Sequence, residues 1–205
     1  MSPTSLLAAD PVVLRAEDGT ALPLDPVRWH AEPTAGEEAL LAGLVAPVLD
    51  VGCGPGRLVV ALSRRGAVAL GVDPAPAAVA LARDRGAAVL QRSVFDPLPG
   101  AGRWRTVLLA DGNIGIGGDP VRLLARCREL LAPGGTVVVE VEPPDSGAGW
   151  RRYRVRLERG ARSGPWFPWA VVDAGAIARL AARAGLELRR LQPIPEEGRW
   201  FAHLR

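Results

Sequence analysis

Three glycines alternate with other residues directly after an acidic residue, in Asp50-Val51-Gly52-Cys53-Gly54-Pro55-Gly56. Glycine lacks a Cβ and tolerates positive φ, so this segment can turn tightly and let a ligand approach its backbone. An apolar run precedes the acid and an apolar helical pattern begins at Leu58. The turn therefore joins a strand to a helix whose first N–H groups are unpaired, and these groups predict a cofactor-binding site.

The elements that must position this turn follow a regular order. From Pro47 onward, apolar runs alternate with helical patterns, which predicts a parallel sheet covered by helices on both faces. The expected strands are 48–51, 68–72, 88–91, 106–110, 136–141, 186–191 and 199–204. The expected helices are 37–45, 57–65, 74–85, 119–131 and 173–184. The fold class is thus expected to be α/β, with a doubly wound, mostly parallel sheet of seven strands.

Two segments depart from this alternation. Residues 1–36 carry five prolines without sustained periodicity and predict an extended, turn-rich N-terminal arm or lid, with a weak hairpin signal at 12–15 and 20–24. Residues 152–158 alternate polar and apolar side chains and can pair with 166–172, which predicts an inserted β-hairpin after the fifth strand. We expect one domain over 1–205, divided into the arm (1–36), a cofactor-binding core (37–149), the hairpin (150–172) and a C-terminal helix with strands (173–205).

Composition indicates a globular protein. The chain has 205 residues, of which 48% are hydrophobic and 23% charged, so general disorder is not expected. All 25 basic residues are arginine, which is typical of coding bias in a GC-rich bacterial genome. Two cysteines without ligand spacing predict neither a metal site nor a disulfide. The start of the chain lacks a signal-peptide pattern and no apolar run is long enough to span a membrane, so we expect a cytoplasmic protein with no membrane partner.

Three motifs in this order resemble those of the class I S-adenosylmethionine-dependent methyltransferases. Asp50 precedes a Gly-x-Gly-x-Gly turn, Gly71-Val72-Asp73 ends the second strand, and Leu130-Leu131-Ala132-Pro133-Gly134-Gly135 precedes the fifth. The resemblance implies a Rossmann-like fold, S-adenosylmethionine as cofactor and S-adenosylhomocysteine as product. It implies that Asp73 binds the ribose hydroxyls, a role that suits a bidentate carboxylate at the carboxyl end of a strand. A nearby acid such as Asp50 favours the cationic amino group of this cofactor and repels a pyrophosphate.

The adenine contact departs from the family pattern. The family commonly has an acid after the third strand, where this sequence has Arg92-Ser93-Val94. Ser93 and the Val94 N–H are our candidates for that contact, and Cys53 is expected to pack as a small apolar group. The expected cofactor-binding residues are Asp50, Gly52, Cys53, Gly54, Gly56, Asp73, Pro74, Ser93, Val94, Ala110 and Asp111.

Methyl transfer from a sulfonium is a direct displacement, in which alignment of the reactants supplies much of the acceleration. His30, Asp111 and Asn113 are the candidates for orienting the acceptor or acting as a base. The expected substrate-binding residues are Trp29, His30, Asn113, Trp150, Trp166 and Trp169.

The sequence favours a small-molecule O, N or C nucleophile as acceptor, because the Asn/Asp-Pro-Pro-Tyr/Phe motif of many nucleobase methyltransferases is absent. One alternative is RNA methylation through the arginines of the hairpin, including Arg152, Arg154 and Arg156. Others are an NAD(P)-binding Rossmann protein, which would prefer a Gly-x-Gly-x-x-Gly turn, and an inactive regulatory module that binds S-adenosylmethionine. The methylated atom and the oligomeric state stay open.

Overall fold

The computed structural model describes residues 12–144, 147 and 149–205; residues 1–11 of the expected arm and residues 145, 146 and 148 lie outside this description. The helices are α1 (Pro26–His30), α2 (Ala35–Ala42), α3 (Arg57–Arg64), α4 (Pro76–Asp84), α5 (Pro120–Leu130) and α6 (Ile177–Arg183), with the 3₁₀ segments η2 (Asn113–Gly118) and η3 (Pro195–Glu197). The strands are β1 (Val12–Ala16), β2 (Ala21–Pro23), β3 (Val48–Val51), β4 (Ala69–Asp73), β5 (Val89–Gln91), β6 (Trp104–Leu109), β7 (Leu131–Val141), β8 (Trp150–Arg159), β9 (Arg162–Val172), β10 (Leu188–Ile194) and β11 (Arg199–Leu204).

Seven strands form one sheet in the order β10-β11-β7-β6-β3-β4-β5. The strands from β3 to β7 run parallel, whereas β11 is antiparallel to both of its neighbours. The chain proceeds from β3 outward to β5 and then returns to β6 on the other side of β3, so the strand order reverses between β3 and β6. Open α/β sheets bind ligands at the carboxyl edge beside such a reversal. The structure confirms the α/β fold with a mostly parallel seven-stranded sheet.

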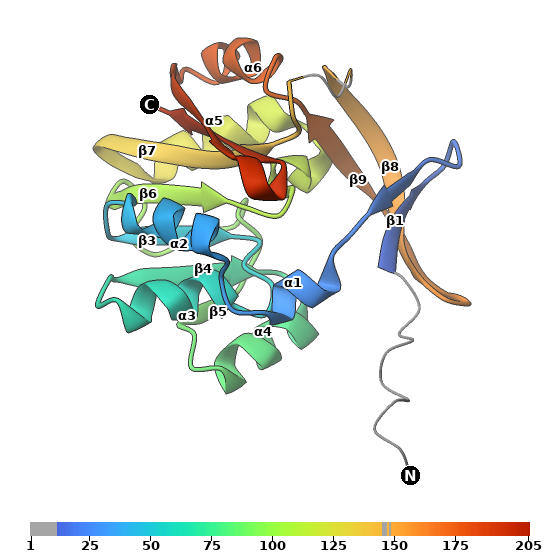
Figure 1. The fold of residues 1–205 in the computed structure, drawn as a ribbon, viewed down its shortest axis with the longest axis horizontal. Helices are drawn as coiled ribbons and strands as arrows, with labels where there is room; N and C mark the ends of the chain where they lie inside the picture. The colour runs from blue at the N-terminus through green and yellow to red at the C-terminus, as the bar shows by residue number, and fades with distance from the viewer. Residues whose placement is uncertain (1–11, 145–146, 148) are drawn as a thin grey trace.

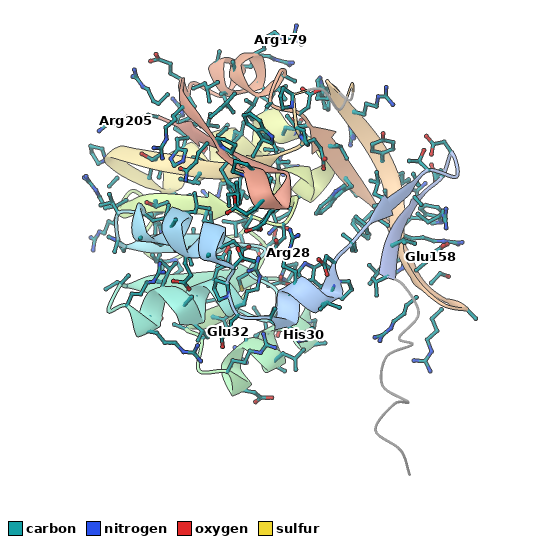
Figure 2. The ribbon with its side chains drawn as sticks, viewed as in Figure 1. Arg28, His30, Glu32, Glu158, Arg179 and Arg205 are labelled. Carbon is teal, nitrogen blue, oxygen red and sulfur yellow. The ribbon has the colours of Figure 1, made fainter. Side chains whose placement is uncertain are left out.

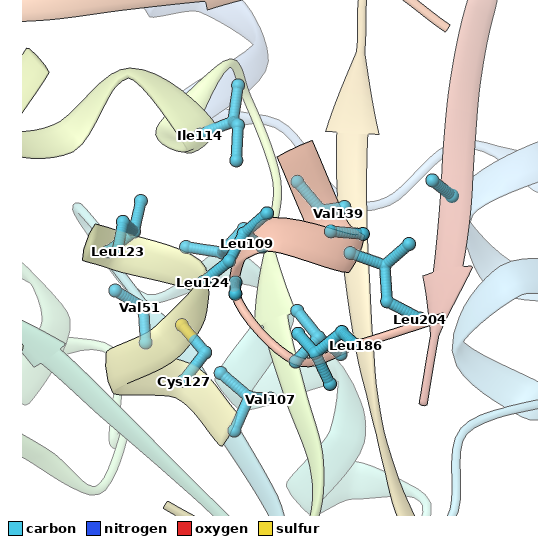
Figure 3. Packing of buried hydrophobic residues seen from close by; sticks show 14 of the residues in the cluster. Val51, Val107, Leu109, Ile114, Leu123, Leu124, Cys127, Val139, Leu186 and Leu204 are labelled. Carbon is cyan, nitrogen blue, oxygen red and sulfur yellow. The ribbon is translucent and has the colours of Figure 1, made fainter. Parts of the chain in front are cut away.

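Helices cover both faces of this sheet, as the alternating pattern predicts. Val48 of β3 packs in a cluster with α2, α3 and α4, while its neighbour Leu49 packs in the cluster on the opposite face with α5 and α6. Figure 3 shows this second cluster, where Leu123, Leu124 and Cys127 of α5 lie among side chains of the strands. Burial of each such leucine side chain contributes about 2 kcal/mol to folding. The carboxyl ends of the central strands are therefore held in a close-packed core.

A second sheet of four antiparallel strands, in the order β2-β1-β8-β9, lies beside the first (Figure 1). The pairing of β8 with β9 confirms the hairpin that the sequence predicts. β1 pairs with β8 from Val12 opposite Arg159 to Ala16 opposite Val155. The small hydrophobic core of this four-stranded sheet contains Leu14, Ala16 and Val155. We call these four strands the lid; the sequence predicts its two hairpins separately but not the pairing that joins them.

The expected extended arm contains helical structure. In α1, the Asp25 carboxylate accepts a hydrogen bond from the Arg28 N–H at 3.0 Å, and Pro26 occupies the first turn. Thr34 and Glu37 form a capping box that starts α2 before the expected residue 37. The expectation of an extended or turn-rich arm did not include this short helix, because proline is favourable at the start of a helix when a capping side chain precedes it.

Several boundaries toward the end of the chain also shift. The helix expected over 173–184 begins later: the Asp173 carboxylate accepts from the Ala176 N–H at 2.9 Å in a preceding turn, and α6 begins at Ile177. The Pro133-Gly134-Gly135 segment lies within β7, where the pairing with β6 is irregular. Among the residues described, no helix is long and apolar enough to cross a membrane.

Candidate functional site

The glycine turn connects β3 to α3 at the carboxyl edge of the seven-stranded sheet. At Gly52, where φ is +73°, a Cβ would lie 2.7 Å from the Asn113 side-chain nitrogen, so only glycine leaves room for that side chain. At Gly54, where φ is +52°, a Cβ would meet no atom within 4 Å. The first glycine thus admits a supporting side chain, and the second leaves the backbone open to a ligand.

The Asp73 carboxylate ends β4 directly beside this turn. Its Oδ2 accepts from the Gly54 N–H at 3.0 Å, and its Oδ1 accepts from the Ala75 N–H at 2.8 Å. Burial raises the pKa of Asp73, although both N–H donors lower it. Each carboxylate oxygen can accept a further hydrogen bond, so Asp73 is suited to a pair of hydroxyl donors.

Three adjoining cavities open at this edge, and we name them by their walls. The turn cavity, of about 330 Å³, is lined by residues that include Gly54, Arg57, Asp73 and Ala78. The Ser93 cavity, of about 400 Å³, is lined by residues that include Asp73, Pro74, Ser93 and Val94. The lid cavity, of about 450 Å³, is lined by residues that include Leu14, Asp111, Glu140, Glu142 and Tyr153. Trp169 of the lid borders all three, and Trp29 borders the turn and lid cavities.

The Ser93 cavity is bordered by Val94, whose backbone N–H is unpaired among the described residues. The Ser93 N–H donates to Asp96 Oδ2 at 2.9 Å, and Ser93 Oγ accepts from the Phe95 N–H at 3.2 Å. The Val94 N–H finds no acceptor within the part of the chain that is described. Ser93 therefore supports the local turn, whereas Val94 offers a free donor to a ring nitrogen.

The loop after β6 supports the glycine turn. Asn113 donates from Nδ2 to the carbonyl oxygens of Val51 and Gly52, each at 2.9 Å. Asp111 has a φ of +52°, the one positive φ outside glycine among the described residues. Such a backbone conformation in a non-glycine residue is uncommon and concentrates at functional sites. The conformation of Asp111 places its carboxylate between two buried arginines.

Those arginines, Arg57 and Arg199, hold a cluster of carboxylates together. Arg57 donates to both oxygens of Glu37 at 2.7 Å and to Asp111 at 3.0 Å. Arg199 donates to Glu140 at 2.7 Å, to Asp111 at 3.1 Å and also to Glu37. Burial would raise the pKa of Glu37, but hydrogen bonds from both arginines bring it down to about 2. We call these five residues the ionic cluster; it links α2, α3, β7, β11 and the loop after β6.

One polar atom of this cluster lacks a partner. Arg57 Nε is fully buried and has no hydrogen-bond partner among the described residues, and Arg57 borders the turn cavity. A buried donor without an acceptor costs about 1–3 kcal/mol. Arg57 therefore keeps one unpaired donor within a side chain that borders the turn cavity.

Asp50 lies at the end of β3 and is 2% exposed. Its carboxylate accepts no hydrogen bond from the described residues and borders none of the three cavities. Burial raises the pKa of Asp50 to about 7, helped by the charge of Asp111 and opposed by Arg57. Asp50 can therefore affect a ligand through its charge rather than by direct contact.

Some residues predicted for the site lie elsewhere. His30 is exposed on α1, and its Nδ1 lies 2.9 Å from an Arg85 nitrogen beyond α4. Figure 2 shows Arg28, which borders the lid cavity, and His30 on different sides of α1. Trp150 is 41% exposed, and Trp166 lies against the Arg156 guanidinium. Neither tryptophan nor His30 borders any of the three cavities.

Two further predicted cofactor residues are buried. Ala110 is 3% exposed at the end of β6 and borders none of the three cavities. Cys53 borders the turn cavity and packs so closely that a Cβ on Gly71 would lie 2.5 Å from its sulfur. Burial raises the pKa of the Cys53 thiol, so this group remains protonated and unreactive.

The sequence reasoning missed Glu37, Arg57, Glu140, Glu142 and Arg199. A signal was available: Glu140 and Arg199 are charged residues within strand patterns, each next to an apolar run. A charge in such a pattern indicates a buried ion pair or a site, because an unpaired buried charge is strongly unfavourable. The partners could not be assigned, since the ionic cluster joins residues up to 162 positions apart.

The doubly wound sheet, the glycine turn and the acid that follows the next strand define a Rossmann-like ligand-binding fold. Residues 31–191 match the family described as a methyltransferase domain. The chain therefore belongs to the methyltransferase-domain family.

Individual relatives share part of their length with this chain. The ubiquinone biosynthesis O-methyltransferase of Pseudomonas paraeruginosa is 30% identical over 173 residues, which are 80% of this chain and 65% of that protein. The protein of the same name from Cereibacter sphaeroides is 35% identical over 96 residues, 44% of this chain and 39% of its own length. The chain thus spans less than two thirds of the length of these curated relatives.

Solved structures show the same fold. An S-adenosylmethionine-dependent methyltransferase from Bacteroides fragilis, in complex with S-adenosylhomocysteine, superposes with a TM-score of 0.77 and 21% sequence identity. The match covers 96% of this chain and 88% of that one. It extends beyond the seven-stranded sheet, because the lid strands are part of the matched length.

Proposed function

We propose that this protein transfers a methyl group from S-adenosylmethionine to an oxygen, nitrogen or carbon nucleophile of a small molecule. The observation that carries this proposal is the junction of the cavities: Trp29 and Asp111 border both the turn cavity and the lid cavity. A cofactor in the turn and Ser93 cavities would thus meet an acceptor in the lid cavity.

The residues present fit this cofactor. Asp73 has the acceptor capacity for the ribose hydroxyls, and the free Val94 N–H suits a nitrogen of the adenine ring. The positively charged guanidinium of Arg57, which borders the turn cavity, suits the amino-acid carboxylate. The charge of Asp50 favours the cationic amino group. The bound cofactor supplies an electrophilic methyl group on a sulfonium.

The protein contributes position and a dry site. Asn113 holds the glycine turn through two hydrogen bonds, and the ionic cluster holds Asp111 at the junction of the cavities. Trp29 and Trp169 border this junction, where their apolar rings reduce contact with water. Alignment of a nucleophile with a methyl group in such a site accelerates displacement without covalent catalysis.

Calorimetry and a labelling experiment test the proposal. We expect S-adenosylmethionine and S-adenosylhomocysteine to bind and NADH not to bind. Incubation with S-adenosylmethionine carrying an isotopically labelled methyl group and with a metabolite extract should give a labelled small molecule by mass spectrometry. Cofactor binding without labelled product in any extract would support an inactive regulatory module instead.

RNA is a less suitable acceptor. On the lid, Arg154 pairs with Glu17, and both Arg15 and Arg156 pair with Glu158, which is labelled in Figure 2. These ion pairs reduce the positive charge that would attract phosphates. An RNA affinity at low salt that is lost on replacing Arg152, Arg154 and Arg156 would contradict this view.

We also propose a cytoplasmic location. Cys53 and Cys127 are both buried free thiols, which suits a reducing compartment. Cell fractionation of the producing organism would test this location.

A further inference from the structure

The lid cavity carries more negative than positive charge. Among the residues that the structure describes, four with carboxylates and two with guanidinium groups border it: Asp25, Asp111, Glu140, Glu142, Arg28 and Arg199. Arg57, which borders the adjoining turn cavity, forms an ion pair with Glu37. A cavity with this balance of charge favours a cationic occupant over an anionic one.

Three of the four carboxylates already have partners within the protein. Asp25 accepts from the Arg28 backbone at 3.0 Å and lies 3.6 Å from its guanidinium. Glu140 accepts two hydrogen bonds from Arg199, and Asp111 accepts from both arginines of the ionic cluster. These three groups are therefore held in place by the fold.

Glu142 differs from them. It directly follows β7, its side chain is exposed, and its carboxylate accepts no hydrogen bond from any residue that the structure describes. Partial burial and the charge of Glu140 raise the pKa of Glu142. Glu142 is thus the carboxylate of this cavity that is free to bind a ligand and suited to take a proton.

The other walls of the lid cavity suit an organic cation. Trp29, Tyr153 and Trp169 provide aromatic surfaces, and Leu14 and Leu24 provide apolar ones. Aromatic faces attract ammonium groups, and apolar walls accommodate the body of the same molecule.

We propose that the methyl acceptor is an amine with an aromatic or apolar body, and that Glu142 binds its ammonium group and takes its proton. This inference rests on the proposed methyl transfer. Loss of one proton to the Glu142 carboxylate leaves a lone pair on nitrogen. That lone pair forms the nitrogen–carbon bond to the methyl group while the carbon–sulfur bond breaks and its electron pair stays on sulfur. The proton passes from Glu142 to solvent.

A matched pair of probes tests the charge preference. Tryptamine and indole-3-acetate share an indole ring but carry opposite charges at neutral pH. With S-adenosylhomocysteine bound, we expect calorimetry to show tryptamine binding at least about tenfold more tightly than indole-3-acetate. Glu142→Gln should weaken tryptamine binding about tenfold and leave the affinity for S-adenosylhomocysteine within about twofold. Glu187→Gln, an exposed control outside the cavity, should change neither.

The outcomes separate this inference from the function on which it rests. If tryptamine binds no more tightly than indole-3-acetate, or if Glu142→Gln leaves its affinity unchanged, the amine assignment is overturned. If the wild type fails to bind S-adenosylhomocysteine, the proposed methyl transfer itself is contradicted.

Turnover gives a second readout. A metabolite extract separated by charge and incubated with labelled S-adenosylmethionine should yield labelled product from the cationic fraction. Glu142→Gln should lower kcat for that acceptor as well as raise KM, because the residue both binds the ammonium and takes its proton. Label confined to neutral or anionic fractions would overturn the amine assignment and leave the methyl transfer standing.

Discussion

Asp50 is buried and Asp73 is partly buried, although both acids lie at the carboxyl ends of neighbouring strands. The Asp73 carboxylate accepts hydrogen bonds from two backbone N–H groups, whereas the Asp50 carboxylate accepts none from the described residues. Hydrogen bonds to a carboxylate favour its charged form, and burial without them favours the neutral form. Asp73 is therefore suited to direct contact with a ligand. Asp50 is suited to act on a ligand through its charge, which depends on pH.

Replacement of Asp50 by Asn should change how stability depends on pH. The pKa of Asp50 is about 7 in the folded protein, above its ordinary value near 4 in an unfolded chain. Between pH 4 and 7 the unfolded state ionises this group and the folded state does not, so the wild type loses stability as pH rises. The unfolding free energy of Asp50→Asn minus that of the wild type should increase by about 2–4 kcal/mol across this window.

Urea denaturation at several pH values measures this difference. Asp84→Asn, an exposed control on α4, should show no comparable increase. A difference between Asp50→Asn and the wild type that stays constant from pH 4 to 8 would contradict the raised pKa.

Replacement of Asp73 by Ala should weaken cofactor binding. Hydrogen bonds to a charged group contribute about 1.5–3 kcal/mol each, so loss of the carboxylate should lower the affinity for S-adenosylhomocysteine about 10- to 100-fold. The wild type should prefer S-adenosylhomocysteine over its 2′-deoxy analogue, and Asp73→Ala should lose this preference. Calorimetry with both compounds would measure this, and an unchanged preference would show that Asp73 does not bind the ribose.

At the scale of elements, the ionic cluster ties five separate segments to the site. The Arg199 side chain is 5% exposed and contacts carboxylates from α2, β7 and the loop after β6. Removal of one partner from a buried ion pair leaves the others charged and unpaired, which is far more costly than loss of an exposed pair. The cluster therefore makes the position of Asp111 depend on the folding of α2 and β11.

Arg199→Met should lower the unfolding free energy by about 3–5 kcal/mol. Arg64→Met is a matched control, because the Arg64 side chain is 63% exposed in its pair with Glu32 and such pairs contribute about 0–1 kcal/mol. Chemical denaturation of the two variants compares them directly. Equal losses would mean that the cluster contributes no more than a surface pair.

At the scale of the whole molecule, two sheets with buried cores of unequal size border the cavities. The buried core of the lid contains Leu14, Ala16 and Val155, whereas the seven-stranded sheet is buried on both faces by large clusters. Local opening is easier where fewer apolar contacts are buried. The lid is thus the element best suited to admit and release ligands.

Hydrogen exchange should show this difference. We expect amides of β1 and β8 to exchange at least about tenfold faster than those of β3 and β6 in the free protein. S-adenosylhomocysteine should slow exchange in the lid and at the glycine turn, because Trp169 and Leu14 border the cavity that it would occupy. Lid amides as protected as those of β3 without ligand would contradict a mobile lid.

The sequence by itself determined the alternating α/β pattern, the glycine turn and the acids that follow the first strands, because hydrophobic period and backbone freedom are local properties. It also predicted the β8–β9 hairpin from alternation alone. It missed α1, since the capping of Asp25 outweighed the prolines around it. Helices, strands and turns can be predicted from the sequence where the contacts that stabilise them are between residues close together in the chain.

Only the tertiary structure decided which distant residues meet. The pairing of β1 with β8 and the contact of Glu37 with Arg199 join segments more than 130 residues apart. The same packing turned His30 toward Arg85, away from the cavities, and left Glu142 free at the lid cavity. These contacts depend on how the two sheets pack. The type and charge of a side chain alone do not determine which distant residue will lie beside it.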